Sequence, residues 1–367
     1  MRFLERSDFA RLLSSLVESG YDLVGPTVRD GAVVLDRIEG VSDLPRGVRE
    51  EQAPGRYRLS HTEDDELFGW SHGPDSAKRF LFPPREVLGS IVRSDGRMTA
   101  AVPEDGERPV AFVGLRSCDL HAVQVQDRVF IGSDPAYRRR RERAVFIGVN
   151  CGRPGATCFC ASMGTGPRCT IGFDLALTEL PDGFVVETGG VRGEELLATL
   201  DLREATEVEE TAALRVTEEA AGLMGREMGT ADMPELLYRN RMHPRWKDVA
   251  ERCLACGNCT SACPTCFCHD VVDTSSITGL EATRTREWAS CFSDEYSWAA
   301  GASVRAGRDA RYRQWLTHKF ASWIDQFGTS GCVGCGRCIT WCPVGIDVTE
   351  EVAAIRATDG EVEVAAR

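Results

Sequence analysis

Two copies of one cysteine pattern constrain this chain more than any other feature of its sequence. Each copy is a run of four cysteines with gaps of two, two and three residues, followed directly by proline. The first motif contains Cys253, Cys256, Cys259, Cys263 and Pro264, and the second motif contains Cys332, Cys335, Cys338, Cys342 and Pro343. Gaps of two residues let a tight loop wrap three thiolates around one cubane, while the fourth cysteine of such a run ligates the neighbouring cluster. The sequence therefore predicts two [4Fe–4S] clusters.

The predicted ligand sets cross between the two motifs. We expect one cluster to be held by Cys253, Cys256, Cys259 and Cys342, and the other by Cys332, Cys335, Cys338 and Cys263. The proline after each fourth cysteine fixes the direction of the backbone and removes one N–H donor. Two zinc sites, or simply buried thiols, are the alternative interpretations. Zinc sites use paired CxxC knuckles rather than four-cysteine runs that end in proline, so the iron–sulfur interpretation is favoured.

The remaining eight of the sixteen cysteines fall into two groups. The first group is Cys118, Cys151, Cys158, Cys160 and Cys169, and the second group is Cys266, Cys268 and Cys291. Loop cysteines at the ends of two strands can converge on a metal, so one hypothesis is a third [4Fe–4S] cluster at Cys118, Cys151, Cys158 and Cys160. The alternative is a set of reduced thiols buried beside the sheet. Cys169 is interpreted as structural, and the second group as thiols that pack near the clusters.

Composition and the first residues of the chain predict a reducing environment for these thiols. The N-terminus lacks the apolar stretch of a secretory signal, and no run of about 18 apolar residues predicts a membrane span. Cytoplasmic proteins keep their thiols reduced, which favours metal binding over disulfides. The 56 acidic residues exceed the 43 basic ones, and a net charge of −13 argues against non-specific binding of nucleic acid. We therefore expect a cytoplasmic protein that neither spans a membrane nor binds nucleic acid.

The pattern of apolar residues predicts an α+β chain. An N-terminal α/β domain with cysteine-rich loops is expected over residues 1–233, an α-helical dicluster ferredoxin domain over 234–350, and a C-terminal tail over 351–367. In the first domain, the apolar runs 109–115 and 144–149 predict buried strands, and residues 9–19 predict an amphipathic helix. In the second domain, residues 309–327 predict a helix with Asp309 as its N-cap. The long link between the two motifs is expected to be helical.

Motifs for substrate chemistry are absent from the sequence. The chain contains no G-x-G-x-x-G after a predicted strand and no G-x-x-x-x-G-K-[ST], and nothing in it resembles a Ser–His–Asp or zincin motif. It also lacks the pairs of cysteines near both termini that a nickel–iron site would need. No catalytic residue is therefore assigned, and the chain is expected to carry electrons for partner proteins that perform the chemistry.

Several blocks of the sequence resemble the beta subunit of cytoplasmic, NADP-linked nickel–iron hydrogenases, the sulfhydrogenases. The blocks span residues 116–120, 150–167, 263–268, 312–319 and 331–346. Within them, the CFC and YRQWLTHK segments are the specific part of the resemblance, since four-cysteine runs are generic. The layout is also similar to that of the A subunit of anaerobic sulfite reductase.

The resemblance implies a place in a four-subunit enzyme. In such an enzyme a nickel–iron large subunit and an iron–sulfur small subunit handle hydrogen, and a flavin subunit binds NAD(P). The beta subunit relays electrons between these two halves, so it is an electron-transfer subunit and not the catalytic one. Two alternatives stay open: the relay subunit of an anaerobic sulfite or polysulfide reductase, and a binding module whose clusters are only structural staples.

Overall fold

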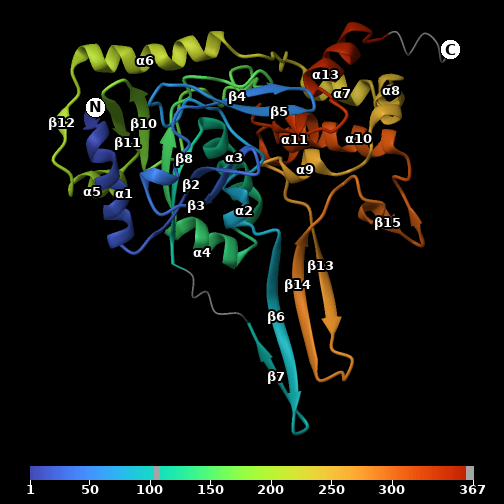
Figure 1. Ribbon diagram of the computed structural model, residues 1–367. Helices are drawn as coiled ribbons and strands as arrows, with labels where there is room; N and C mark the ends of the chain where they lie inside the picture. The colour runs from blue at the N-terminus through green and yellow to red at the C-terminus, as the bar shows by residue number, and fades with distance from the viewer. Residues whose placement is uncertain (103–107, 361–367) are drawn as a thin grey trace.

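An eight-stranded mixed sheet organises the N-terminal half of the chain (Figure 1). The computed structural model describes residues 1–102 and 108–360. The strand order is β12 (Arg203–Glu204), β1 (Arg2–Glu5), β11 (Gly183–Thr188), β10 (Leu175–Leu180), β9 (Val145–Val149), β8 (Val110–Leu115), β2 (Asp22–Arg29) and β3 (Ala32–Arg37). The central strands β10, β9, β8 and β2 run parallel, and antiparallel strands flank them on both sides. The strands predicted at 109–115 and 144–149 are β8 and β9, and they are direct neighbours.

Helices cover both faces of this sheet. They are α1 (Phe9–Glu18) and α5 (Val191–Leu197) on one face, and α2 (Lys78–Leu81), α3 (Ser117–Phe130) and α4 (Pro135–Arg143) on the other. On the first face, Phe9 and Leu16 of α1 are fully buried, which confirms the amphipathic helix predicted at 9–19. On the second face, Phe112 and Phe146 stack between the sheet and the helices. Strands buried on both faces in this way explain why the central runs are continuously apolar.

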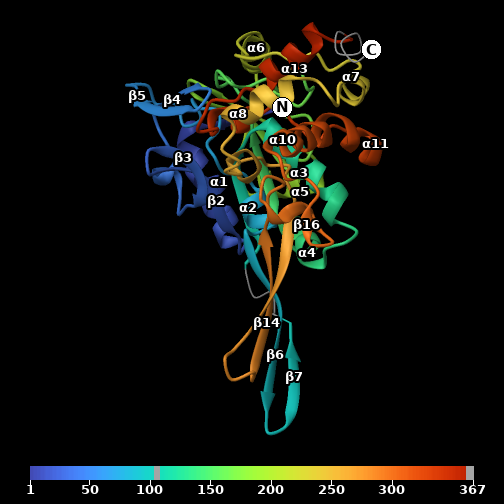
Figure 2. The same cartoon turned by 90° about the vertical axis from the view of Figure 1, so that its right-hand side faces the viewer.

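A second, four-stranded antiparallel sheet projects from the body as a long arm (Figures 1 and 2). The arm consists of β13 (His269–Ser275), β14 (Glu281–Trp288), β6 (Arg85–Ser94) and β7 (Arg97–Ala101), in that order. Every residue of β7 and β13 is exposed, so the outer part of the arm builds no core of its own. Because β14 pairs with β6, chain segments on both sides of residue 233 share one sheet.

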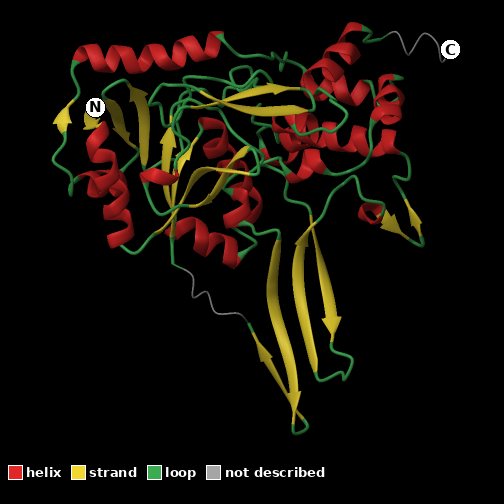
Figure 3. Cartoon of the chain, in the orientation of Figure 1, coloured by secondary structure: helices red, strands yellow, loops and turns green. Residues whose placement is uncertain are grey.

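The prediction that the link between the two motifs is helical is wrong for the first half of that link. Residues 269–288 form the hairpin β13–β14, and β15 (Trp298–Ala299) and β16 (Ala302–Ser303) follow it (Figure 3). The hairpin is rich in β-branched residues, among them Val271, Val272 and Thr285, which favour strands over helices. The fold as a whole is therefore mixed α and β in both halves.

Short helices surround the two cysteine motifs and enclose the second apolar core. They are α7 (Met233–Arg239), α8 (Arg245–Arg252), α9 (Asn258–Ser261), α10 (Arg308–Thr317), the π-helical turn η4 (His318–Ser322), α11 (Trp323–Phe327), α12 (Arg337–Thr340) and α13 (Val348–Ala357). Large side chains fill the space between them, including Trp246, Tyr312 and Trp315. Phe159, from a loop of the N-terminal half, is fully buried in the same core.

The helix predicted over 309–327 is present but interrupted. It begins after Gly307, so Asp309 lies in its first turn and is not the N-cap. The π-helical turn η4 separates α10 from α11. The carbonyl of Lys319 accepts hydrogen bonds from outside the helix, from Gly331 N at 2.7 Å and Ser330 Oγ at 3.1 Å. A carbonyl that is engaged outside the helix accounts for the irregular turn, and such π turns are frequent at functional sites.

The remaining elements bridge or border these two parts. They are α6 (Glu207–Gly222), β4 (Val48–Ala53), β5 (Arg56–His61) and the 3-10 turns Arg6–Asp8, Val41–Asp43 and Glu295–Ser297. The β4–β5 hairpin reaches the second motif, because Gly55 N donates to Ile339 O at 3.1 Å and Tyr57 stacks on Trp341. Among the helices of the described residues, none has the length and apolar character needed to cross a bilayer.

Candidate iron–sulfur centres

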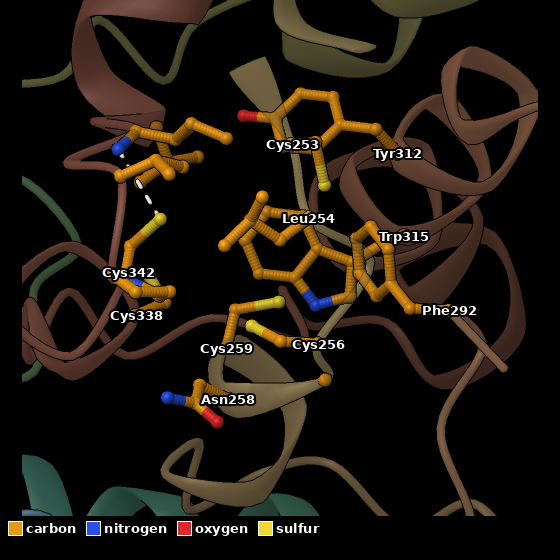
Figure 4. A pocket seen from close by; sticks show the side chains of 15 residues that line it. Cys253, Leu254, Cys256, Asn258, Cys259, Phe292, Tyr312, Trp315, Cys338 and Cys342 are labelled. Carbon is orange, nitrogen blue, oxygen red and sulfur yellow. Dashed lines mark hydrogen bonds between the residues drawn. The ribbon is translucent and has the colours of Figure 1, made fainter. Parts of the chain in front are cut away.

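Three cysteines of the first motif and two of the second motif line a common pocket (Figure 4). The helix α8 leads directly into Cys253, and Gly257 begins α9 in a left-handed conformation, with φ of +77°. The pocket is lined by Cys253, Cys256, Cys259, Cys338 and Cys342, with an apolar wall that includes Phe292, Tyr312 and Trp315. Cys342 thus lies with the first three cysteines of the other motif. We call Cys253, Cys256, Cys259 and Cys342 the first centre.

Backbone amides at this pocket point at sulfur atoms. Ala255 N donates to Cys253 Sγ at 3.4 Å, and Ile346 N donates to Cys342 Sγ at 3.3 Å. Such donors stabilise the thiolate form of a cluster ligand. Across residues 1–102 and 108–360, no three His, Cys, Asp or Glu side chains gather tightly enough to hold a single metal ion. In a [4Fe–4S] cluster each thiolate binds a different iron atom, so its four sulfurs stand apart.

Cys263, the fourth cysteine of the first motif, lies near the thiols of the second motif. Burial, together with the neighbouring thiols of Cys332, Cys335 and Cys263, raises the pKa of the Cys338 thiol well above its ordinary value. Gly334 N donates to Cys332 Sγ at 3.4 Å, and Gly336 begins α12 as Gly257 begins α9. We call Cys332, Cys335, Cys338 and Cys263 the second centre. Cys338 also lines the pocket of the first centre, so the two centres are adjacent.

Two buried lysines at the second centre show that it suits an anionic group. Lys319 Nζ lies 3.1 Å from Cys263 Sγ, and Lys78 Nζ donates to Cys263 O at 2.8 Å. Burial lowers the pKa of Lys78 to about 8, against the opposing effect of Cys266 and Cys263, so it is charged at neutral pH. Burial also disfavours charge on Lys319, but Cys263 and Cys266 raise its pKa above its ordinary value. Neither lysine pairs with a carboxylate of the described residues, and a thiolate-ligated cluster would supply the missing negative charge.

The N-terminal cysteines also converge, at the carboxyl ends of β8 and β9. Cys118 lies in the first turn of α3 directly after β8, and Cys151 follows β9 by two residues. The loop that continues from Cys151 brings Cys158 and Cys160 to them, and all four side chains are buried. Burial, together with the thiols of Cys151 and Cys335, raises the pKa of the Cys160 thiol to about 12. We call Cys118, Cys151, Cys158 and Cys160 the third centre.

A buried arginine makes the third centre suitable for an anionic cluster. The Arg116 guanidinium is 2% exposed and donates to the carbonyls of Phe68 at 2.7 Å, Ser71 at 3.0 Å and Asn150 at 3.3 Å, and also to that of Trp70. No carboxylate among the described residues forms an ion pair with it. The guanidinium also lies over the Trp70 ring, 4.6 Å from its centre, and its charge acts on the buried Glu50 carboxyl, whose pKa burial raises. A buried guanidinium without an ion-pair partner favours further negative charge nearby, and the thiolates of a bound cluster would provide it.

The loop of the third centre lies directly on the second motif. Phe159 N donates to Gly334 O at 2.8 Å, and Thr165 Oγ1 donates to Val333 O at 2.6 Å. A Cβ atom at Gly334 would lie 2.7 Å from the backbone of Cys160, so no larger residue fits there. The equivalent position of the first motif is Ala255, which adopts the same left-handed conformation. The loop of the third centre therefore packs on the second motif, and the second centre adjoins the first through Cys338. The three centres form a continuous series.

Several residues of these centres had no signal in the sequence. His72 Nε2 lies 3.5 Å from Cys158 Sγ, while its Nδ1 is buried without a partner in the described structure. His72, Lys78 and Arg116 reach the cysteines only through tertiary packing, so no local pattern could identify them. Gln52 similarly joins the third centre to α12, accepting from both Thr157 and Thr340.

The remaining cysteines occupy different surroundings. Cys169 packs against Gly148 and Leu120, and its backbone N donates to Asn150 Oδ1 at 2.7 Å. Cys266 lies next to Cys263, whose thiol pKa it lowers through a hydrogen bond. Cys268 Sγ lies 3.8 Å from the Tyr296 hydroxyl, and Cys291 is buried near Cys259. Among all sixteen cysteines, which are unpaired, only Cys256 of the first centre is exposed.

The ion pair between Arg337 and Asp119 ties the second motif to α3, and we expect its loss to be costly. The two groups lie 2.8 Å apart and are 2% and 6% exposed. Replacing Arg337 by methionine leaves the Asp119 carboxylate buried without its cation, which should lower the free energy of unfolding by about 3–5 kcal/mol. Urea unfolding of the anaerobic protein measures this change.

Two further variants control for this effect. Arg284→Met removes one partner of an exposed ion pair with Asp273 on the arm and should leave the unfolding midpoint near that of the wild type. The double variant Asp119→Asn/Arg337→Met should be more stable than Arg337→Met alone, because no unpaired charge stays buried. Equal stability of the single and double variants would contradict this account.

Comparisons with known proteins agree with the cysteine geometry. Residues 252–346 match the family model of a 4Fe-4S dicluster domain. Over 294 residues the chain is 34% identical to sulfhydrogenase 2 subunit beta of Pyrococcus furiosus. The alignment covers 76% of this chain and 82% of that relative. No solved structure matches the chain.

Proposed function

The chain belongs to the sulfhydrogenase beta subunit family, and on this premise we propose that it relays electrons between a nickel–iron hydrogenase module and a flavin/NAD(P) module. The observation that carries the proposal is the continuous series of three cysteine centres, each in contact with the next. Bound [4Fe–4S] clusters supply one-electron redox chemistry, and adjacent clusters let electrons pass along the chain. The subunit would thus carry electrons and perform no substrate chemistry itself.

The ligand assignment follows the three centres. We assign one cluster to the first centre and one to the second, with Cys342 and Cys263 exchanged between the motifs. A third cluster is assigned to the third centre, with Arg116 offsetting its charge. Phe292, Tyr312 and Trp315 form an apolar wall on one side of the first centre, and the amides of Ala255, Ile346 and Gly334 donate to ligand sulfurs.

The division of the chain is also part of the proposal. An α/β domain up to about residue 233 would present the third centre, and a dicluster domain over 234–350 would hold the other two. The arm is shared, because β6 comes from the first part and β14 from the second. The sixteen unpaired thiols support a reducing compartment, the cytoplasm, as its location.

The two ends of the series suggest how partners are arranged. The first centre reaches the surface through Cys256, whereas the third lies within the N-terminal half. We propose the hydrogenase small and large subunits and a flavin/NAD(P)-binding subunit as partners. A sulfite or polysulfide reductase would use the same relay with other partners, so the copurifying subunits decide between these functions.

Anaerobic purification of the tagged chain from its own host tests the proposal. We expect about twelve iron atoms per chain if three clusters are present, and about eight if only the two motifs are filled. Reduction should produce EPR signals of interacting [4Fe–4S]⁺ spins, and nickel–iron and flavin subunits should copurify. Clusters that cannot be reduced would contradict the relay and indicate that they only stabilise the fold. Copurification of sulfite reductase subunits would instead support the relay of a sulfite reductase.

A further inference from the structure

The two lysines at the second centre come from distant parts of the chain. Lys319 lies in the π-helical turn η4, and Lys78 lies in α2 of the N-terminal half. Their exposed fractions are 5% and 4%. Burying two ammonium groups side by side is costly unless negative charge compensates them. Both lysines lie at Cys263, so a negative charge on the cluster that this cysteine would ligate can compensate them.

Lys319 donates a hydrogen bond to the Cys263 sulfur. Its Nζ lies 3.1 Å from Cys263 Sγ and 3.2 Å from Thr265 Oγ1. Thr265 Oγ1 also lies 3.1 Å from that sulfur, but its hydroxyl proton is given to Gly331 O at 2.6 Å. A hydroxyl has a single proton to donate, so Thr265 gives none to the sulfur, whereas the ammonium of Lys319 does donate to it.

Lys78 brings a second positive charge without touching the sulfur. Its Nζ donates to the carbonyls of Ser261 at 3.1 Å and Cys263 at 2.8 Å, at the end of α9. It also lies 3.9 Å from the centre of the Trp288 ring, which shields it from water. Because Lys78 is buried, the low local dielectric strengthens the interaction of its charge with neighbouring groups.

Cations near the first centre are compensated or exposed. Arg252 and Arg245 both bind the buried carboxylate of Glu351, at 2.6 Å and 2.5 Å. Arg308 donates to Cys253 O at 2.7 Å but is exposed to solvent, which screens its charge. Of these two centres, the second is therefore the one with buried cations, Lys319 and Lys78, that no carboxylate of the described residues neutralises.

We propose that Lys319 and Lys78 raise the reduction potential of the cluster ligated by Cys263 above that of the cluster at the first centre. The proposal rests on the cluster assignment given above. Reduction adds one electron to an already anionic cluster, so buried positive charge and a hydrogen bond to its sulfur stabilise the reduced form. The second centre thereby becomes the position where an electron rests between transfers.

Redox titration of the intact complex, followed by EPR, tests the two lysines as positioning residues. The signal of the second centre is identified by its absence in Cys263→Ala. We expect Lys319→Met to lower the ratio of reduced to oxidised second centre at least tenfold at a fixed potential, a shift of about 59 mV for one electron. Lys78→Met should shift the same signal in the same direction, and Lys319→Arg, which keeps the charge, should shift it less.

Controls separate this effect from misfolding and from failure of the relay. Lys247→Met removes an exposed lysine of α8 and should change neither potential. Unchanged potentials in Lys319→Met with a full complement of iron would overturn the proposal. If Lys319→Met loses iron, Lys78→Met decides, and an unchanged potential there overturns it. A wild-type protein without reducible clusters would instead refute the relay function itself.

Discussion

Replacing Cys263 by alanine is expected to remove the cluster held by Cys332, Cys335 and Cys338, which lie about seventy residues later in the sequence. The reason is the exchange of fourth ligands: Cys263 lies among the thiols of the second motif, and Cys342 lines the pocket of the first. A cubane with three thiolates is far less stable than one with four. Iron analysis should show a loss of about four atoms per chain, and the spin interaction should disappear from the EPR spectrum.

The reciprocal variant provides the matched comparison. Cys342→Ala should remove the cluster at Cys253, Cys256 and Cys259 and leave the second centre in place. Loss of the first centre in Cys263→Ala, with the second intact, would show that each motif keeps its own fourth cysteine and that the crossed assignment is wrong.

Cys158→Ser in the full-length chain is expected to lower the iron content by about four atoms per chain. Cys118, Cys151, Cys158 and Cys160 are buried at the carboxyl ends of β8 and β9, and Arg116, which forms no ion pair among the described residues, is buried among the same loops. These observations fit a third cluster better than isolated core thiols, which would need no buried cation. The visible absorbance of the thiolate-ligated iron should fall in proportion.

Cys169→Ser serves as the control for this loss. Cys169 belongs to the same segment and is equally buried, but its sulfur packs against Gly148 and Leu120, and it is not one of the four assigned ligands. The Cys169→Ser variant should retain the full iron content. Equal iron in Cys158→Ser and in the wild type would leave two clusters and make the N-terminal half a scaffold.

Local patterns in the sequence were enough to predict the strands and the motifs. β8 and β9 are short apolar runs buried on both faces, and such runs are recognisable without knowledge of their neighbours. The dicluster domain follows from the spacing of its cysteines, and the family model matches that region. The helix α1 follows from four apolar residues at helical spacing.

Features that depend on distant contacts could not be predicted in this way. The arm joins β6 and β14, which are separated by almost two hundred residues, so neither strand shows its partner in the local sequence. The π-helical turn at Lys319 arises because Gly331 and Ser330 engage its carbonyl. Lys78 and Arg116 look like ordinary surface cations in the sequence, and only their burial beside cysteines distinguishes them.

The contact between Gly334 and the loop of Cys160 also fixes the order in which the protein can mature. Cys160 leaves the ribosome roughly 170 residues before Gly334, which at ~5–20 residues per second is on the order of 10–30 s. During that interval the oldest thiols of the chain stay open to water and oxidants, because the segment that covers them has not been synthesised. The last tenth of the chain covers the loop that the first half supplies, so a nascent chain that stops early leaves the thiols of the third centre uncovered.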